Sequence, residues 1–174
     1  TTFLMSKAGL QPHAFLGGIP VDFPSNYVAG DGNLVVVEAD EYDRSFLHLS
    51  PQYAIVLSTD PDHLDIYGDH ENMLETGFRA FVRGMKKGGH LIVRYDVADT
   101  FRDLEGIKLS TFGIGKGDYC ARNIRVEDGA FHFDLEEPNG HVLINLKTAL
   151  PGRHNIENAI AACAVTRLAG GSEA

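Results

Sequence analysis

Residues 34–43 read Leu-Val-Val-Val-Glu-Ala-Asp-Glu-Tyr-Asp, a short apolar run followed at once by a cluster of carboxylates. Three further apolar runs bounded by turn residues occur at residues 14–16, 54–57 and 91–93. Short continuous runs, rather than alternating ones, are typical of strands buried in a parallel sheet. The stretch 34–43 therefore predicts a buried parallel strand whose carboxyl end carries acidic side chains.

Helical patterns lie between these predicted strands. The clearest covers residues 72–82, where apolar side chains recur at spacings of three and four; they are Met73, Leu74, Phe78, Phe81 and Val82. Such spacing places them on one face of a helix. Alternation of strands and helices predicts an α/β fold with a mostly parallel sheet flanked by helices.

The pattern changes after Thr111. Shorter alternating segments at 119–126, 130–135 and 141–146 are separated by Gly and Asp turns, which predicts a small antiparallel β extension of the sheet. The alanine-rich stretch from Asn155 to Leu168 follows and has high helix propensity. We find no repeat or long linker, and we therefore expect residues 1–174 to form a single domain.

Composition narrows the classes of partner. With 174 residues, 44% of them apolar, the chain can bury a core, and its net charge of −9 would repel nucleic acid and anionic membranes. Cys120 and Cys163 lack the spacing of a disulfide framework or a zinc cluster. No apolar run reaches the length of a membrane span and no signal peptide pattern opens the chain, so we expect a cytoplasmic location.

Two acidic clusters follow neighbouring predicted strands. The first begins at Glu38, and the second covers residues 58–65, including His63. Ligands of open α/β sheets bind beyond the carboxyl ends of the strands. Carboxylate-rich sites with few nitrogens favour Mg²⁺ or Mn²⁺ over Zn²⁺. The alternatives are a solvated acidic loop for the first cluster and a hydrogen-bonded loop histidine for His63.

A third group of polar residues opens the predicted C-terminal helix. Asn155 and Asn158 are three residues apart, so both amides can face one ligand. A carboxamide offers a donor beside an acceptor, which matches the edge of adenine. The alternative is that Asn155 caps the helix, which spacing alone favours but which leaves Asn158 unexplained.

Glycine-rich and polar residues elsewhere carry weaker signals. Residues 113–117 lack the spacing of a phosphate-binding loop, and we interpret them as a turn. Gly17 and Gly18 follow a strand, where a tight turn could bring backbone close to a substrate. Arg44 and Ser45 are either polar neighbours of the site or the exposed face of a short helix.

Three ordered strings resemble those of the ATP-dependent peptidoglycan (Mur) ligases. They are residues 37–41 (Val-Glu-Ala-Asp-Glu), 62–67 (Asp-His-Leu-Asp-Ile-Tyr) and 151–158 (Pro-Gly-Arg-His-Asn-Ile-Glu-Asn). The fuller match over residues 38–49 most resembles the branch that adds L-alanine to UDP-N-acetylmuramate. The nearest rival is the branch that recycles murein tripeptide.

The resemblance implies an ATP-binding central domain related to phosphate-loop NTPases, with ATP and Mg²⁺ bound and an acyl phosphate formed on the substrate. It implies catalytic and metal-binding roles for Glu38 and His63. It also implies that Asn155 and Asn158, with His154, hold the adenine, which replaces the cap interpretation of Asn155. Substrate contacts are expected from Gly17, Gly18, Arg44 and Ser45.

The family pattern also implies segments outside this sequence. Its phosphate loop, ending in Gly-Lys-Thr, is expected just before Thr1, and UDP-binding and C-terminal domains are expected on either side. We therefore expect the isolated chain to be inactive. A non-catalytic nucleotide- or metal-binding module is the alternative from another class. Some relatives carry a carbamylated lysine where this chain has Gly77 and Phe78. The alanine-adding branch is not expected to carry that lysine, so the lack of a lysine at these positions fits this branch.

Overall fold

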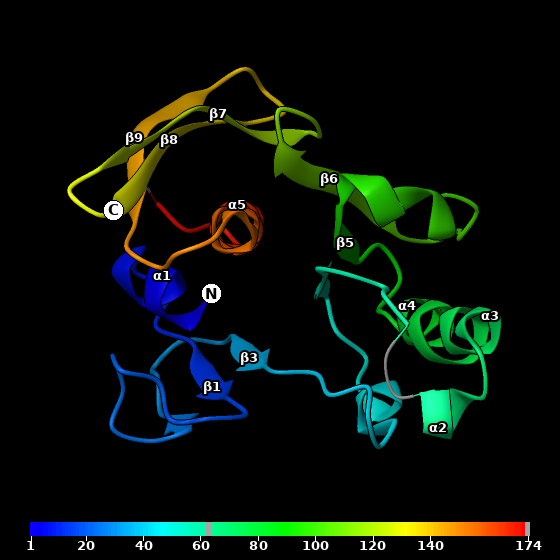
Figure 1. Cartoon of the computed structure of the whole chain (residues 1–174). Helices are drawn as coiled ribbons and strands as arrows, with labels where there is room; N and C mark the ends of the chain where they lie inside the picture. The colour runs from blue at the N-terminus through cyan, green and yellow to red at the C-terminus, as the bar shows by residue number, and fades with distance from the viewer. Residues whose placement is uncertain (62–63, 173–174) are drawn as a thin grey trace. The chain divides into compact units, whose positions relative to one another are not determined.

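The computed structural model describes residues 1–61 and 64–172 (Figure 1). The chain forms two compact units. The first contains Thr1–Ala39 and the end of the chain from Ala162, and the second contains Asp40–Ala161. Each unit has its own sheet, and each is described by itself.

The first unit combines helix α1 (Thr2–Lys7) with a three-stranded sheet in the order β2-β1-β3. Strand β1 (His13–Phe15) pairs in parallel with β3 (Val35–Val37) and antiparallel with β2 (Tyr27–Val28). Both strands predicted at residues 14–16 and 34–37 are present, and they pair in parallel. The prediction that residues 34–37 form a buried strand is wrong, because Val35 and Val37 are 56% and 42% exposed. Strand β2 was not predicted, because two residues are too few to show a periodic pattern.

The second unit contains a six-stranded sheet in the order β4-β5-β6-β7-β8-β9. Its first four strands are parallel, and they are β4 (Tyr53–Val56), β5 (His90–Arg94), β6 (Lys108–Ile114) and β7 (Tyr119–Glu127). The last two, β8 (Ala130–Glu136) and β9 (Val142–Thr148), add the antiparallel extension. The α/β fold with a mostly parallel sheet and a small antiparallel extension is therefore confirmed.

Strand β6 shows where the sequence interpretation was incomplete. The turn predicted at residues 113–117 begins later, because Gly113 and Ile114 still pair with β7. Gly115 and Gly117, with φ of 73° and 99°, make the turn itself. Backbone pairing with β5 on its other side fixes β6 despite its polar Lys108 and Ser110.

Helical segments of the second unit are mostly short. They are η1 (Ser45–His48, 3₁₀), α2 (Leu64–Tyr67), α3 (His70–Met73), η2 (Leu74–Arg79, π-helical), α4 (Ala80–Arg83) and η3 (Tyr95–Thr100, 3₁₀). The helix predicted at 72–82 is thus present, with a π-helical middle. Helix α5 (Arg153–Leu168), whose residues up to Ala161 belong to the second unit and whose remainder belongs to the first, matches the predicted C-terminal helix.

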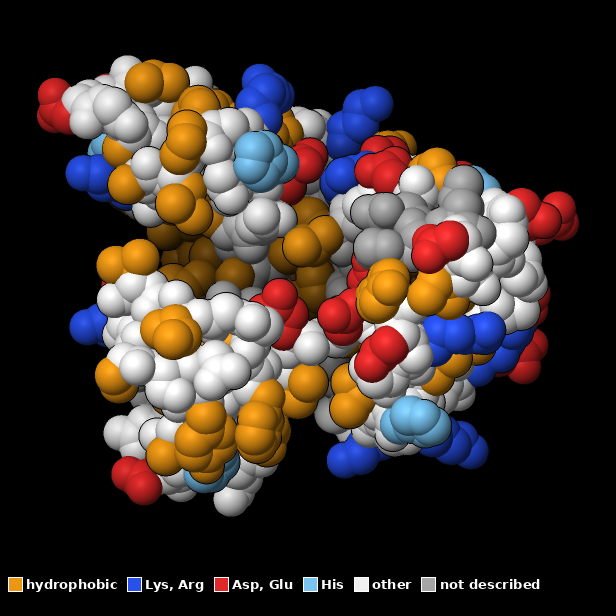
Figure 2. Space-filling model, turned by 60° about the horizontal axis from the view of Figure 1, so that its bottom comes forward, with side chains coloured by type: hydrophobic (Ala, Val, Ile, Leu, Met, Phe, Trp, Pro, Cys, Tyr) orange, Lys and Arg blue, Asp and Glu red, His pale blue; other side chains and the backbone are white. Residues whose placement is uncertain are grey.

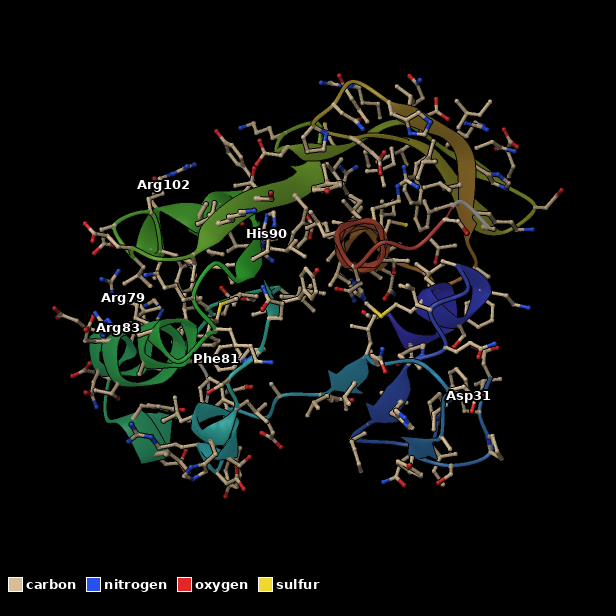
Figure 3. All side chains as sticks on the ribbon, turned by 180° about the vertical axis from the view of Figure 1, so that it is seen from behind. Asp31, Arg79, Phe81, Arg83, His90 and Arg102 are labelled. Carbon is tan, nitrogen blue, oxygen red and sulfur yellow. The ribbon has the colours of Figure 1, made fainter. Side chains whose placement is uncertain are left out.

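The main hydrophobic core of the second unit lies between β4, β5 and the segments η1, α4 and η3. Its buried members are Phe46, Ala54, Val56, Phe81, Val82, Met85, Leu91, Val93, Ala98 and Phe101. Arg79 of η2 and Arg83 of α4 are labelled in Figure 3, and both form salt bridges with Glu75. This packing anchors β4 and β5, whose carboxyl ends carry candidate site residues.

The surface is rich in acidic side chains, several of which are exposed on the face shown in Figure 2. Within the described residues, we find no helix that combines the length and apolarity required to cross a membrane.

Candidate functional site

Glu38 lies immediately after β3, and its side chain contacts the backbone after β1. The Gly17 N–H donates a hydrogen bond of 2.8 Å to Glu38 Oε2. The Glu38 N–H donates to the carbonyl of Phe15 at 3.0 Å, which extends the β1–β3 ladder to Glu38. The first unit therefore brings together two predicted site residues, Glu38 and Gly17, at the carboxyl ends of adjacent parallel strands.

A side chain at position 17 would crowd the Glu38 carboxylate in its present position. A Cβ atom added to Gly17 would lie 2.9 Å from Glu38 Oε1, closer than real Cβ contacts allow. A Cβ atom on Gly18 would meet nothing within 4 Å. Of the two glycines predicted near the substrate, only Gly17 thus has a steric reason to lack a side chain.

Residues 40–43, which we call the acidic segment, open the second unit with a tightly folded turn. The side chain of Asp40 accepts the Tyr42 N–H and that of Asp43 accepts the Ser45 N–H, both at 2.9 Å. Hydrogen bonding from Ser45 lowers the pKa of Asp43. Ser45 begins the short helix η1, which agrees with the interpretation that it lies on the face of a short helix.

Arg44 points toward the helical segment that follows α2. Its Nη2 donates to the carbonyl of Thr76 at 3.0 Å, and its guanidinium lies 5.3 Å from the ring centroid of Tyr67. Arg44 is half-buried, so the alternative of an exposed helix face does not describe it. Arg44 and Ser45 belong to the second unit, whereas Glu38 and Gly17 belong to the first.

The second acidic cluster follows β4. The Asp60 N–H donates to Ser58 Oγ at 3.0 Å, and the ring of His70 makes a hydrogen bond of 2.7 Å with the carbonyl of buried Thr59. His63, the predicted metal ligand of this cluster, lies outside the described residues. Among residues 1–61 and 64–172, no three His, Cys, Asp or Glu side chains are grouped as metal ligands.

The polar start of α5 places its three predicted residues together. Asn155 Nδ2 donates to the carbonyl of Pro151 at 2.6 Å and lies 3.1 Å from His154 Nε2. Asn158 Nδ2 donates to Asn155 Oδ1 at 3.4 Å. The helix begins at Arg153, so Asn155 lies inside it and the cap interpretation is wrong. Asn158 is exposed and its amide is available to a ligand.

Arg94, at the end of β5, is a candidate site residue that the sequence reasoning missed. Its Nε and Nη2 bind both carboxylate oxygens of Asp96, at 2.6 and 3.0 Å. This salt bridge raises the pKa of Arg94, and the carboxylates of Glu157 and Asp60 add to the rise. The Arg94 charge therefore interacts with carboxylates that follow β4 and lie near the start of α5. Its position directly after the apolar run 91–93 was the available signal.

Chemically, these sites suit a nucleotide and a hard cation. Helix α5 presents amides, and the strand ends present carboxylates with a guanidinium among them. One carboxylate oxygen of Glu38 accepts the hydrogen bond from the Gly17 N–H, and the other oxygen is able to contact a cation.

Comparison with known proteins shows a family match over most of the chain. A model of the Mur ligase middle domain matches residues 24–166. The UDP-N-acetylmuramate–L-alanine ligase of Christiangramia forsetii is 44% identical over 163 residues, covering 93% of this chain and 34% of the relative.

Two solved structures from Thermotoga maritima share the fold. The UDP-N-acetylmuramate–alanine ligase has a TM-score of 0.76 and 28% identity, with 97% of this chain and 38% of that chain covered. The MurF ligase in complex with ADP has a TM-score of 0.78 and 16% identity, with 99% and 42% covered.

Proposed function

Because this chain belongs to the Mur ligase middle-domain family, we propose that it is the ATP-binding part of a ligase that joins L-alanine to UDP-N-acetylmuramate. The observation that carries this proposal is 44% identity over 93% of the chain to a ligase of that specificity. The polar start of α5 and the carboxylate after β3 supply chemistry that such a reaction needs.

The chain spans about a third of the length of the curated relatives that it matches, 34% for the first of them. We propose that the activity belongs to a full-length ligase. In that ligase, a phosphate loop ending in Gly-Lys-Thr, a UDP-binding domain and a C-terminal domain complete the site. The 174 residues alone are then expected to be inactive and to bind nucleotide weakly, because a phosphate loop supplies most contacts to the β- and γ-phosphates.

We assign Glu38 and His63 to Mg²⁺. Glu38 fits this role, since it is an exposed carboxylate at a strand end with one oxygen oriented by the Gly17 N–H. Mg²⁺ commonly takes one or two protein ligands and completes its shell with phosphate oxygens and water. His63 is assigned from its motif. When bound, the cation neutralises charge on the transferring phosphoryl group.

We assign Asn158, Asn155 and His154 to the adenine of ATP. Asn155 is held by the Pro151 carbonyl, and its Oδ1 accepts from Asn158, so the two amides are oriented relative to each other. Gly152 keeps this turn compact, because at φ 96° an added Cβ would lie 2.5 Å from the His154 ring. The exposed amide of Asn158 can donate to and accept from the adenine edge.

The proposed reaction proceeds in two steps. A carboxylate oxygen of UDP-N-acetylmuramate attacks the γ-phosphorus of ATP, and the bond from that phosphorus to the β–γ bridging oxygen breaks. ADP departs, and the substrate carries an acyl phosphate. The amine of L-alanine then attacks the acyl carbon, and the tetrahedral adduct expels phosphate as the amine loses its proton. Gly17, Gly18, Arg44 and Ser45 are proposed to contact the acceptor. We assign the ligase to the cytoplasm, because the reaction consumes ATP and a UDP-sugar.

The test is ATP-dependent phosphate release by the full-length ligase. We expect release only when UDP-N-acetylmuramate and L-alanine are both present, and loss of at least a hundredfold in Glu38→Gln. Release with murein tripeptide in place of L-alanine would identify the recycling branch instead. Nucleotide binding without release for any acceptor would identify a non-catalytic module.

A further inference from the structure

The backbone at Arg44 adopts a conformation that side chains seldom take. Its φ is 61°, in the left-handed region, at the junction between the acidic segment and η1. Such a conformation is costly for a residue other than glycine and persists only where surrounding contacts fix it. The contacts of Arg44 therefore identify what holds this junction.

Tyr67 provides the first of these contacts from α2, which lies beside η1 (Figure 1). Its hydroxyl donates to the carbonyl of Glu41 at 2.8 Å, and the Arg44 N–H donates to the same carbonyl at 3.3 Å. Tyr67 is only 2% exposed, and this burial raises the pKa of its hydroxyl. A buried hydroxyl with a backbone partner fixes the acidic segment at Glu41.

The Arg44 side chain provides a second link. Its guanidinium lies 5.3 Å from the Tyr67 ring centroid, within the range of a cation–π contact. Its Nη2 hydrogen bond reaches the carbonyl of Thr76, inside the π-helical segment η2. One side chain thus connects the acidic segment, α2 and η2.

Gly77 makes room for this arrangement. A Cβ atom at position 77 would lie 3.1 Å from Cε1 of the Tyr67 ring. Asn72 completes the support, since its Nδ2 donates to the Tyr67 carbonyl at 2.5 Å. Single π-helical turns occur often at functional sites. Here the π-helical segment η2 packs against the Tyr67 ring, and Tyr67 in turn holds the acidic segment.

We propose that Tyr67 and Arg44 are positioning residues that hold the acidic segment in the conformation used to bind the metal–nucleotide substrate. The proposal rests on the function proposed above, because it takes the carboxylates after β3 to be at the nucleotide site. Neither residue needs to touch the metal. Each acts through the backbone of residues 40–44, by the two bonds to the Glu41 carbonyl and the bond to Thr76.

The experiment uses the full-length ligase with Mn²⁺ and a non-hydrolysable ATP analogue. Electron paramagnetic resonance measures free Mn²⁺ during titration of the wild type, Tyr67→Phe, Arg44→Lys and Glu38→Gln. The matched controls are Tyr95→Phe, which alters a tyrosine that is 45% exposed, and Arg102→Lys, which alters an arginine of a surface ion pair. Amide hydrogen exchange at Arg44 and Ser45 and the melting temperature are recorded for each variant.

We expect Tyr67→Phe and Arg44→Lys each to weaken Mn²⁺–nucleotide binding about threefold to tenfold, the effect of losing one structural hydrogen bond. Exchange at Arg44 and Ser45 should rise, while the controls stay within twofold of wild type. Wild-type affinity in both variants, with weakened binding in Glu38→Gln, would overturn the positioning role and leave the proposed function standing. Wild-type affinity in Glu38→Gln would overturn the proposed function itself.

Discussion

Substitution of Gly17 by alanine is expected to impair metal–nucleotide binding through Glu38, without altering any ligand. The added Cβ would lie 2.9 Å from Glu38 Oε1 and 3.1 Å from Cδ. Both atoms lie at the end of the flexible Glu38 side chain, so we expect the carboxylate to relieve the contact by turning away from position 17. Turning it breaks the 2.8 Å hydrogen bond from the Gly17 N–H.

The size of the effect follows from that bond. A hydrogen bond with a charged partner contributes about 1.5–3 kcal/mol, and exposure of Glu38 to water favours the lower half of this range. A loss of about 1.5–2 kcal/mol corresponds to binding weakened about tenfold to thirtyfold. The assay is Mn²⁺–nucleotide affinity in the full-length ligase, with the unfolding midpoint in urea as the measure of stability.

Gly18→Ala is the matched control for nucleotide binding measured without the acceptor substrate, because its Cβ would meet nothing within 4 Å. It should bind within about twofold of wild type, well inside the effect expected at position 17. The reasoning is refuted if Gly17→Ala and Gly18→Ala bind metal–nucleotide equally well.

Three predictions concern stability. Phe101→Ala, at a core position that is 1% exposed, should cost about 3–5 kcal/mol in urea unfolding, and a loss below 1 kcal/mol would contradict the packing. Gly77→Ala should cost about 1–3 kcal/mol, because its Cβ crowds the Tyr67 ring, whereas an unchanged unfolding midpoint would show that the ring moves freely. Hydrogen bonding with Arg79 lowers the pKa of Asp103 from 3.8 to about 2 in the folded protein. The ionised Asp103 therefore stabilises the fold fully above the pKa of the unfolded chain, and this stabilisation is lost as pH falls through the folded-state pKa. Urea midpoints of wild type and Asp103→Asn should therefore differ at pH 7 and converge near the folded pKa; a gap independent of pH would exclude this ion pair.

The fold was largely predictable because its strands carry local signals. The apolar runs at 34–37, 54–57 and 91–93 correspond to β3, β4 and β5. Of these, β5 has the continuous burial that such a run predicts, whereas β4 alternates and Val35 and Val37 of β3 are exposed. Strand β6 lacks that signal at Lys108 and Ser110, and pairing on both sides determines it. The π-helical turn in η2 also lacked a signal, because its spacing of apolar residues resembles that of an ordinary helix.

The candidate site was predictable in its residue types and less so in its contacts. The spacing of Asn155 and Asn158 suggested cooperation, and their side chains do interact. The contact of Glu38 with Gly17 joins residues 21 apart, and that of Arg44 with Thr76 joins residues 32 apart. Such long-range partners depend on tertiary packing, which local patterns do not contain. The roles of Glu38, His63 and the α5 amides stay predictions.

The central claim is that the start of α5 holds the adenine of ATP. Calorimetric titration of magnesium–ATP into the full-length ligase tests it most directly, using wild type, Asn158→Ala and Asn158→Asp. Asn33→Ala, at an exposed asparagine before β3, is the control. The account predicts that both Asn158 variants bind about tenfold or more weakly, since each loses hydrogen bonding to the base, while Asn33→Ala binds as wild type. Wild-type affinity in both Asn158 variants would contradict the claim.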